Sequence, residues 1–317
     1  MKKEILTKIK EYNKIIIHGH TRPDGDCYGA GFGLKYTIEE TYPEKEVYYP
    51  GESTAFYNYV GSKDDIADSV YEGALVIVVD TATKTRVSDD RWRLADFIIK
   101  IDHHIPVDDY GDLTWVDTTY PACSLMVTEF INEFKDELNI PKKAAVALYT
   151  GIVTDTGNFV YRGVGAKTMN LAATLLDYGV QVYDDVMKNV NRRPLVKVKF
   201  EGYVLQNFEI TDNGFAYIKL PLSVQDEYNV SNEIAASSVS LLADIEGIKA
   251  WAAFIEYPNT EVLRGRLRSS SIELDKLANK YSGGGHKYAC GTNHQGWSNV
   301  DDLIAEMDIL LKNKRSE

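Results

Sequence analysis

The stretch Ile15-Ile16-Ile17-His18-Gly19-His20-Thr21-Arg22-Pro23-Asp24-Gly25-Asp26 decides how the rest of the chain is interpreted. A short apolar run followed by glycine and proline is typical of a buried parallel strand that ends in a loop. Open α/β sheets bind ligands in such loops. Here the loop carries His20, Asp24 and Asp26, and the two carboxylates repel each other unless a positive charge lies between them. Taken alone, the stretch fits a divalent cation site and a solvated turn equally well, because Pro-Asp-Gly-Asp also favours turns.

Composition limits the classes of function. A chain of 317 residues is long enough for two domains. Its net charge of −12 disfavours a protein that coats long duplexes, but not one that binds a small phosphorylated substrate. Three distant cysteines argue against a disulfide framework. There is neither a signal peptide nor an apolar stretch of the roughly 20 residues needed to span a bilayer. We therefore expect a cytoplasmic protein without a membrane partner.

The first half alternates strands and helices, which predicts a doubly wound parallel α/β sheet with right-handed crossovers. Strands are expected over residues 14–17, 46–49, 74–79, 97–101 and 113–116, and a helix over 29–40. Helical spacing then continues over residues 124–138, 142–154, 166–176 and 182–190.

The second half predicts a smaller, mixed α/β domain. Hairpins are expected over residues 208–220, around Asn-Gly, and over 250–268. Helices are expected over residues 272–281 and 300–312. We therefore expect a catalytic domain over residues 1–190, a linker over 191–206 and a second domain over 207–317.

Three of the expected strands end in acidic or histidine residues, and this is the strongest functional signal. The groups are His20, Asp24 and Asp26 after the first strand, Asp80 after the third, Asp102, His103 and His104 after the fourth, and Asp155 at the end of a helical segment. Because the carboxyl ends of parallel strands share one edge of the sheet, these groups should converge. Carboxylates with imidazoles suit Mn²⁺, Zn²⁺ or Fe²⁺ better than Mg²⁺. Two ions about 3.5–4 Å apart, bridged by one carboxylate, would use the whole set.

In this order, the motifs resemble the four motifs of the DHH phosphoesterase family over residues 15–160. The resemblance implies a site for two divalent cations, with Mn²⁺ expected. By resemblance, one ion is held by His20, Asp24 and Asp80, and the second by Asp26, Asp80, His103 and Asp155. Asp80 would bridge the two ions and so take part in catalysis. His104 would contact the substrate phosphate, and Asp102 would orient an imidazole. Ala30 departs from the family, which commonly has serine after Gly29.

The second half carries a matching signature. Ser282-Gly283-Gly284-Gly285-His286 is similar to the Gly-Gly-Gly-His motif of the DHH-associated C-terminal domain. Glycines let a backbone approach an anion and His286 can donate to phosphate, although a glycine run is commonly a flexible loop. Three arginines alternate on one strand and therefore share a face: Arg264, Arg266 and Arg268. Their guanidinium groups are suited to binding phosphate. The alternative interpretation is that they keep an exposed strand edge soluble. The expected substrate-binding residues are His286, Arg268, Ser269, Gly284, Gly285 and Arg264.

Within the family, the two-domain plan resembles enzymes that hydrolyse very short RNAs of two to a few nucleotides and convert pAp to AMP and phosphate. The resemblance places the active site in the cleft between the domains, with the second domain closing over the substrate. A phosphodiesterase for cyclic di-AMP or pApA is the alternative, and a nucleotide-binding sensor without turnover is a third hypothesis. Expected partners are short single-stranded RNA, dinucleotides and pAp, and no long duplex. The sequence leaves a homodimer open.

Overall fold

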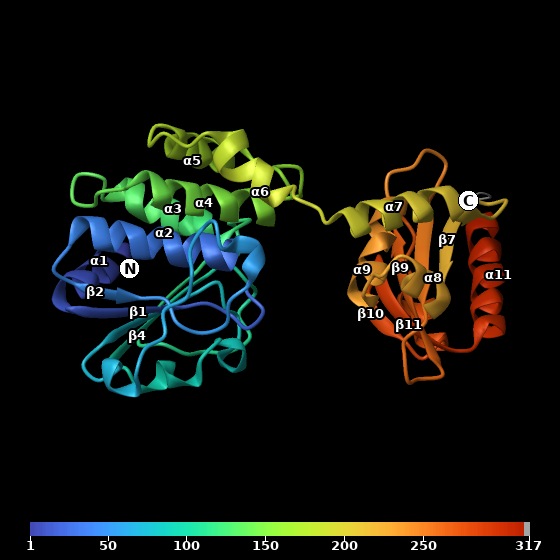
Figure 1. Cartoon of the computed structure of the whole chain (residues 1–317), viewed down its shortest axis with the longest axis horizontal. Helices are drawn as coiled ribbons and strands as arrows, with labels where there is room; N and C mark the ends of the chain where they lie inside the picture. The colour runs from blue at the N-terminus through green and yellow to red at the C-terminus, as the bar shows by residue number, and fades with distance from the viewer. Residues whose placement is uncertain (314–317) are drawn as a thin grey trace. The chain divides into compact units, whose positions relative to one another are not determined.

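The computed structural model describes residues 1–313, which form two compact units, Met1–Arg192 and the part of the chain from Arg193 onward (Figure 1). The last four residues of the predicted second domain, 314–317, lie outside the described residues. No helix within residues 1–313 is long and apolar enough to cross a membrane. All three cysteines are buried and free.

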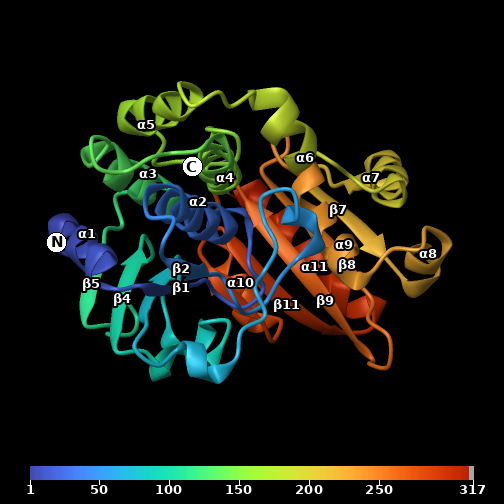
Figure 2. The ribbon, with the colours of Figure 1, turned by 60° about the vertical axis from the view of Figure 1, so that its left-hand side comes forward.

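The first unit is built on a five-stranded parallel sheet, as the alternating pattern predicted. Its strands are β1 (Lys14–His18), β2 (Glu46–Tyr48), β3 (Leu75–Val79), β4 (Phe97–Asp102) and β5 (Leu113–Val116). They lie in the order β2-β1-β3-β4-β5. Figure 2 labels β1, β2, β4 and β5 together with α2 and α3, which pack on the sheet. The chain leaves β1 toward one side and later returns to β3 on the other. The β1/β3 boundary is therefore a topological switch point, where open sheets bind ligands.

Helices cover one face of this sheet (Figure 1). They are α1 (Lys2–Glu11), α2 (Gly25–Thr41), α3 (Cys123–Glu133) and α4 (Lys142–Asp155), with α5 (Ala166–Leu176) packed on α3 and α4. A π-helical turn, Val182–Met187, and α6 (Lys188–Val190) follow. On the other face, Val76 and Val78 pack with Tyr71, Trp92 and Tyr110 from loops and 3₁₀ turns. Those turns span Ala55–Tyr57, Asp68–Val70, Lys84–Arg86 and Asp90–Leu94.

Helix α2 begins at Gly25, four residues before its predicted start. Asp24 caps it, because its Oδ1 accepts hydrogen bonds from the backbone N–H groups of Asp26 and Cys27, both at 3.1 Å. Asp26 therefore lies in the first helical turn rather than in a loop, and the rigid helix fixes the direction of its side chain.

A face of glycines lets α2 pack closely on α4. A Cβ at Gly25 would lie 2.3 Å from Thr154 Oγ1, and one at Gly29 would lie 2.7 Å from the carbonyl oxygen of Ala147. A Cβ at Gly33 would lie 2.5 Å from Leu148. The spacing of four residues puts all three glycines on one side of the helix. The resulting contact holds the start of α2 beside the end of α4.

The second unit contains a six-stranded mixed sheet. Its strands are β6 (Glu209–Ile210), β7 (Phe215–Leu220), β8 (Ala250–Ile255), β9 (Val262–Ser269), β10 (Gly284–His286) and β11 (Ala289–Gln295). The order is β10-β11-β9-β8-β7-β6, and only the β7–β8 pair is parallel. One face packs on α10 (Asp275–Lys280) and α11 (Trp297–Asn313). The β7–β8 half of the other face packs on α7 (Leu195–Asn207), α9 (Asn232–Ser237) and the 3₁₀ turn Ser238–Leu242, beside α8 (Leu222–Glu227).

Two segments differ from the sequence-based expectation. Residues 191–206 were predicted as a linker, but Leu195–Asn207 form α7, whose Phe200 and Val204 are buried in a core of the second unit. The glycine run, for which a flexible loop was the alternative to an anion-binding motif, contains β10 (Gly284–His286), which pairs with β11. Pro194 was expected to be able to begin a helix, but local composition could not show where α7 packs or that β10 pairs, because their partners lie far along the chain.

The glycine face of α2 generates the first prediction. Gly29→Ala should destabilise the first unit by about 1–3 kcal/mol, because the new methyl group must push α4 away. Urea unfolding of the full chain measures the effect. Gly202→Ala in α7 is the matched control, because a Cβ there meets nothing within 4 Å, and alanine is the better helix former. Equal stability of Gly29→Ala and the unmodified protein would contradict the close-packing argument.

Candidate metal centre

The centre of the site is Asp80, the residue directly after β3. Its backbone lies in the left-handed region (φ +52°), and its N–H donates to the carbonyl of Ile101 on β4 at 2.9 Å. The side chain is 2% exposed. Its Oδ2 lies 3.5 Å from His20 Nε2 and its Oδ1 lies 3.3 Å from His103 Nε2. The two oxygens of one buried carboxylate therefore face two different imidazoles.

Backbone contacts define which ring nitrogens face the carboxylates. His20 Nδ1 lies 2.9 Å from the carbonyl oxygen of Thr21, and His103 Nδ1 lies 3.1 Å from that of Tyr120. Because a carbonyl only accepts, Nδ1 carries the proton in both rings. In a neutral ring Nε2 then presents a lone pair to carboxylates that are also acceptors. Either an extra proton or a metal ion must lie between them, so the donor set fits divalent cations.

The other predicted ligands form two groups around Asp80. On one side, Asp24 Oδ2 lies 3.6 Å from His20 Nε2. On the other, His103 Nε2 lies 3.4 Å from Asp155 Oδ2 and 3.8 Å from Asp26 Oδ2. The structure thus brings all six predicted ligands together, with Asp24 beside His20 and with Asp26 and Asp155 beside His103.

The position of Asp26 depends on a helix that the sequence analysis did not connect with it. Its two carboxylate oxygens accept hydrogen bonds from the backbone N–H groups of Cys123 (2.6 Å) and Ser124 (2.9 Å), at the start of α3. These N–H groups have no partner within their own helix, and the positive end of the helix dipole stabilises the carboxylate. Nothing in the local sequence indicates this pairing across nearly 100 residues.

The pKa values of the site residues reflect the several carboxylates that lie close together. Burial, reinforced by Asp80 and Asp155, raises the pKa of Asp26 well above its usual range. Burial also raises the pKa of Asp155 to about 6, against the opposing effect of His103. For His20 and His103 burial lowers the pKa, but the neighbouring carboxylates outweigh it and raise both pKa values to about 10. Without metal the imidazoles therefore hold protons that a metal ion would displace.

Of two further residues near the ends of these elements, Cys27 approaches the site and His18 does not. The ligand atoms of Cys27 lie within 4.8 Å of those of His20 and Asp80. Burial raises the pKa of the Cys27 thiol well above its ordinary value, which favours the protonated form over a metal-binding thiolate. His18 points elsewhere, since its Nε2 lies 3.1 Å from the hydroxyl of Tyr71.

His104 is half exposed beside the buried ligands. Its Nδ1 lies 2.8 Å from Asp102 Oδ1 and 3.5 Å from Asp80 Oδ1. Asp102 is fully buried, and its other oxygen lies 3.5 Å from the ammonium of Lys100, which is also buried. The contact between Asp102 and the His104 imidazole is compatible with the orienting role that the sequence analysis proposed for Asp102. Lys100 was not predicted, because an alternating lysine in a strand usually lies in solvent.

In the second unit, the register of the sheet aligns the predicted substrate residues. His286 pairs with Ala289, Ala289 with Arg268, and Arg268 with Trp251, so these side chains share one face on four neighbouring strands. Arg266 pairs with Gly291, which pairs with Gly284 on the same face.

Ser269 and Gly285 do not belong to this face. Ser269 is buried on the opposite side of β9, where its hydroxyl accepts from the N–H of Ile272 at 2.7 Å. Gly285 also faces away, and a Cβ there would lie 2.6 Å from the carbonyl oxygen of Ala289. Both residues shape the backbone, and we leave them out of the substrate site.

Both units match known protein families. Residues 14–152 match the family described as "DHH family, N-terminal domain", and residues 212–313 match the "DHHA1 domain". The chain is 38% identical to a Streptococcus mutans protein named probable bifunctional oligoribonuclease and PAP phosphatase, covering 98% of this chain and 99% of that protein. It is 36% identical to the Bacillus subtilis bifunctional oligoribonuclease and PAP phosphatase, with the same coverage.

Two other matches are more distant. A cyclic-di-AMP phosphodiesterase of Geobacillus thermodenitrificans is 23% identical over 88% of this chain, which spans 44% of that protein. The crystal structure of an exopolyphosphatase-related protein from Bacteroides fragilis has a TM-score of 0.79 at 24% identity, and covers 98% of this chain and 97% of its own. This structural match supports the fold.

The central position of Asp80 predicts a specific loss. Asp80→Asn keeps the size of the side chain and tolerates the left-handed backbone, but removes the shared charge. We expect Mn²⁺ affinity to fall by at least about 100-fold, more than removal of an outer partner causes. Calorimetry measures the binding. Asp244→Asn is the matched control, because Asp244 has a similar φ (+56°) and is exposed in the second unit. Undiminished affinity in Asp80→Asn would disprove the shared role.

The raised histidine pKa values predict proton release. Metal binding requires neutral imidazoles, whereas His20 and His103 keep their protons up to about pH 10 without metal. Near pH 8, loading should therefore release close to one proton from each ring, and affinity should rise with pH below 10. Calorimetry in buffers of different ionisation enthalpy counts the protons. The His286→Gln variant should release the same number, and a pH-independent affinity would contradict the prediction.

Proposed function

The chain belongs to the DHH family, and on that premise we propose that it hydrolyses very short RNAs to mononucleotides and pAp to AMP and phosphate. The family and the full-length relatives support a phosphoesterase, and the DHH phosphoesterases depend on metal ions. The short-RNA and pAp substrates are those for which the two full-length relatives are named.

One observation carries the proposal: the two oxygens of buried Asp80 face His20 and His103 separately. This arrangement suits a carboxylate shared by two cations, with Asp24 completing one set and Asp26 and Asp155 the other. When bound, two divalent cations supply positive charge for the phosphoryl oxygens and activate the attacking water. We favour Mn²⁺, because the set mixes imidazole nitrogens with carboxylate oxygens.

The chain's own residues position the phosphate. His104, held by Asp102, exposes its imidazole beside the ligand set, where a protonated ring can donate to a phosphate oxygen. The hydrogen bond to Asp102 raises the pKa of His104, which favours that protonated ring. We assign metal chemistry to the first unit and substrate binding to the second, through Arg268 and His286. Gly284 has no side chain and so leaves space for substrate on the sheet face that carries Arg268 and His286.

The alternatives have less support. The cyclic-di-AMP phosphodiesterase is a distant relative that is more than twice as long as this chain, so we do not favour its substrate. A sensor without turnover would not need a complete ligand set. Three free, buried cysteines are consistent with a reducing compartment, and we propose the cytoplasm.

Product analysis tests the proposal. Mn²⁺-loaded protein is incubated with pAp, short RNAs, pApA, cyclic di-AMP and pyrophosphate, and the products are separated. We expect mononucleotides from the RNAs and AMP with phosphate from pAp, and no turnover by Asp80→Asn. Cleavage of cyclic di-AMP alone would favour the alternative. If the metal-bound protein formed no product from any of these substrates, the proposed enzymatic activity would be refuted.

A further inference from the structure

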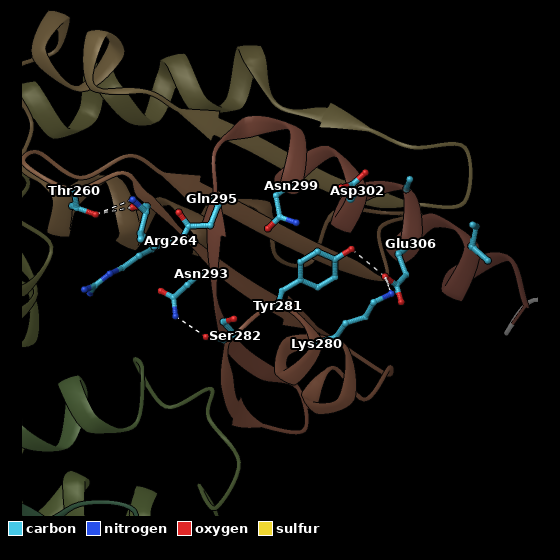
Figure 3. Close-up of a pocket in the computed structure, with 13 residues that line it drawn as sticks. Thr260, Arg264, Lys280, Tyr281, Ser282, Asn293, Gln295, Asn299, Asp302 and Glu306 are labelled. Carbon is cyan, nitrogen blue, oxygen red and sulfur yellow. Dashed lines mark hydrogen bonds and ion pairs between the residues drawn. The ribbon is translucent and has the colours of Figure 1, made fainter.

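Lys100 lies in the middle of β4 and is 1% exposed, although lysines are almost never fully buried unless their charge is paired. A lysine in an ion pair commonly lies at the surface instead. Lys280 is an example: its ammonium lies 2.6 Å from Glu306 Oε2, both residues line a cavity of the second unit, and its side chain is 63% exposed (Figure 3). Surface pairs of this kind contribute little to stability. A buried ammonium costs much more, so its partners indicate its role.

The partners of Lys100 come from the loops that follow β3 and β4 and from the end of β4 itself. Nζ donates to the carbonyl oxygen of Ala82, in the loop after β3, at 3.0 Å. It lies 3.5 Å from the carbonyl oxygen of Asp108, in the loop after β4, and 3.5 Å from Asp102 Oδ2. The ring of Tyr110 covers the ammonium, with its centre 4.4 Å from Nζ. One buried cation therefore joins both loops to the carboxylate of Asp102.

The carboxylate of Asp102 has one oxygen for each of two neighbours. Its Oδ1 lies 2.8 Å from His104 Nδ1 and accepts a hydrogen bond from the backbone N–H of His104 at 3.3 Å. Its Oδ2 is buried and accepts no hydrogen bond within residues 1–313, and the cation beside it is Lys100. Because a carboxylate is planar, the attraction of Oδ2 toward Lys100 fixes Oδ1 toward His104. The orientation of the imidazole therefore depends on Lys100 as well as on Asp102.

Packing by itself does not require a charge at this position. Lys100 and Asp102 lie on the sheet face opposite Ile99 and Ile101, which pack in the helix-covered core. The neighbour of Lys100 on β3 is Val78, which belongs to an apolar cluster. An apolar side chain would suit this face, and replacement of a buried ion pair by apolar residues often leaves stability unchanged or raises it. The charge of Lys100 therefore indicates a role in the site.

We propose that Lys100 is a positioning residue that, through Asp102, holds the His104 imidazole in the direction required for phosphate binding. Without the ammonium, the carboxylate of Asp102 can turn, and the imidazole loses its fixed orientation. The phosphate-binding role of His104 rests on the proposed function, whereas the series of contacts from Lys100 to His104 rests on the geometry of the first unit.

The metal ligands have other anchors. The N–H of Asp80 donates to a carbonyl of β4, and His103 Nδ1 lies 3.1 Å from the carbonyl oxygen of Tyr120. Neither contact involves the ammonium of Lys100. The proposal therefore requires that loss of Lys100 weakens phosphate binding much more than metal binding, whereas a general loss of structure would weaken both.

Calorimetric titration of inorganic phosphate into the Mn²⁺-loaded full chain tests the proposal without requiring turnover. Lys100→Met keeps the length of the side chain but removes its charge. We expect this variant to bind phosphate about tenfold more weakly, the effect of one hydrogen bond to a charged group, and to bind Mn²⁺ within about threefold of the unmodified protein. Unchanged phosphate binding would overturn the proposal, and so would an equal loss of Mn²⁺ affinity.

A double-variant cycle tests whether Lys100 acts through His104. His104→Gln alone should also weaken phosphate binding about tenfold. In the His104→Gln background, Lys100→Met should cause no further loss, because the group that it positions is already absent. Losses that multiply to about 100-fold would show two independent effects and contradict the proposal.

Lys35→Met is the matched control. Lys35 is another buried lysine of the first unit, and it donates to the carbonyl oxygen of Val47 and to Asp64 Oδ2. Its loss should leave phosphate binding within about twofold. Thermal unfolding confirms that each variant is folded. If Lys100→Met is not folded, Lys100→Gln repeats the test with an uncharged polar side chain that ends one atom short of the ammonium, and the same results are expected.

Turnover is measured separately on pAp and short RNA. If phosphate binding follows the expected pattern but the unmodified protein hydrolyses neither substrate, the proposed function fails and the link from Lys100 to His104 stands. If the protein hydrolyses both while Lys100→Met binds phosphate normally, the link fails and the proposed function stands. Absence of phosphate binding by the unmodified protein would overturn the role assigned to Lys100.

Discussion

The site depends on the placement of one buried carboxylate between two imidazoles. Asp80 is held at the end of β3 by a hydrogen bond to β4, in a left-handed backbone conformation that asparagine and aspartate tolerate better than most residues. Two histidines and three further carboxylates surround it, and mutual repulsion would separate them without cations or protons. The packing of the first unit must therefore hold together groups that repel one another, and cations or protons between them would reduce that repulsion.

Three packing features oppose this repulsion. The parallel sheet brings the ends of β1, β3 and β4 to one edge, beside the switch point of the strand order. The glycine face of α2 allows a close approach to α4 and so sets Asp26 near Asp155. The first N–H groups of α3 hold the carboxylate of Asp26. Each feature positions a charged group through the backbone. Because the backbone of a sheet or helix is stiffer than a side chain, it can hold like charges in place.

The second unit carries the residues proposed to bind phosphate. Its sheet packs on helices on one face, whereas the core on the other face is formed with β7 and β8, and the arginines lie on the neighbouring strand β9. The glycines of the Gly-Gly-Gly-His segment allow close pairing within the sheet. A Cβ at Gly283 would overlap the carbonyl of Gly291, and Gly285 has a positive φ (+139°). The glycine run therefore permits close strand pairing, and this pairing places His286 in line with Arg268.

The sequence by itself determined the parallel sheet, most element bounds and the convergence of six carboxylate and histidine residues, because strand periodicity and the residues that follow each strand are local properties. It could not reveal the Asp26 contact with α3, the buried Lys100 beside Asp102, or the burial of Ser269. Those depend on residues distant in the chain that meet only after folding. Even the glycine spacing on α2, which was visible, had no meaning without α4. Tertiary structure alone decided these features, because the register of a sheet and the packing of helices determine which atoms are neighbours.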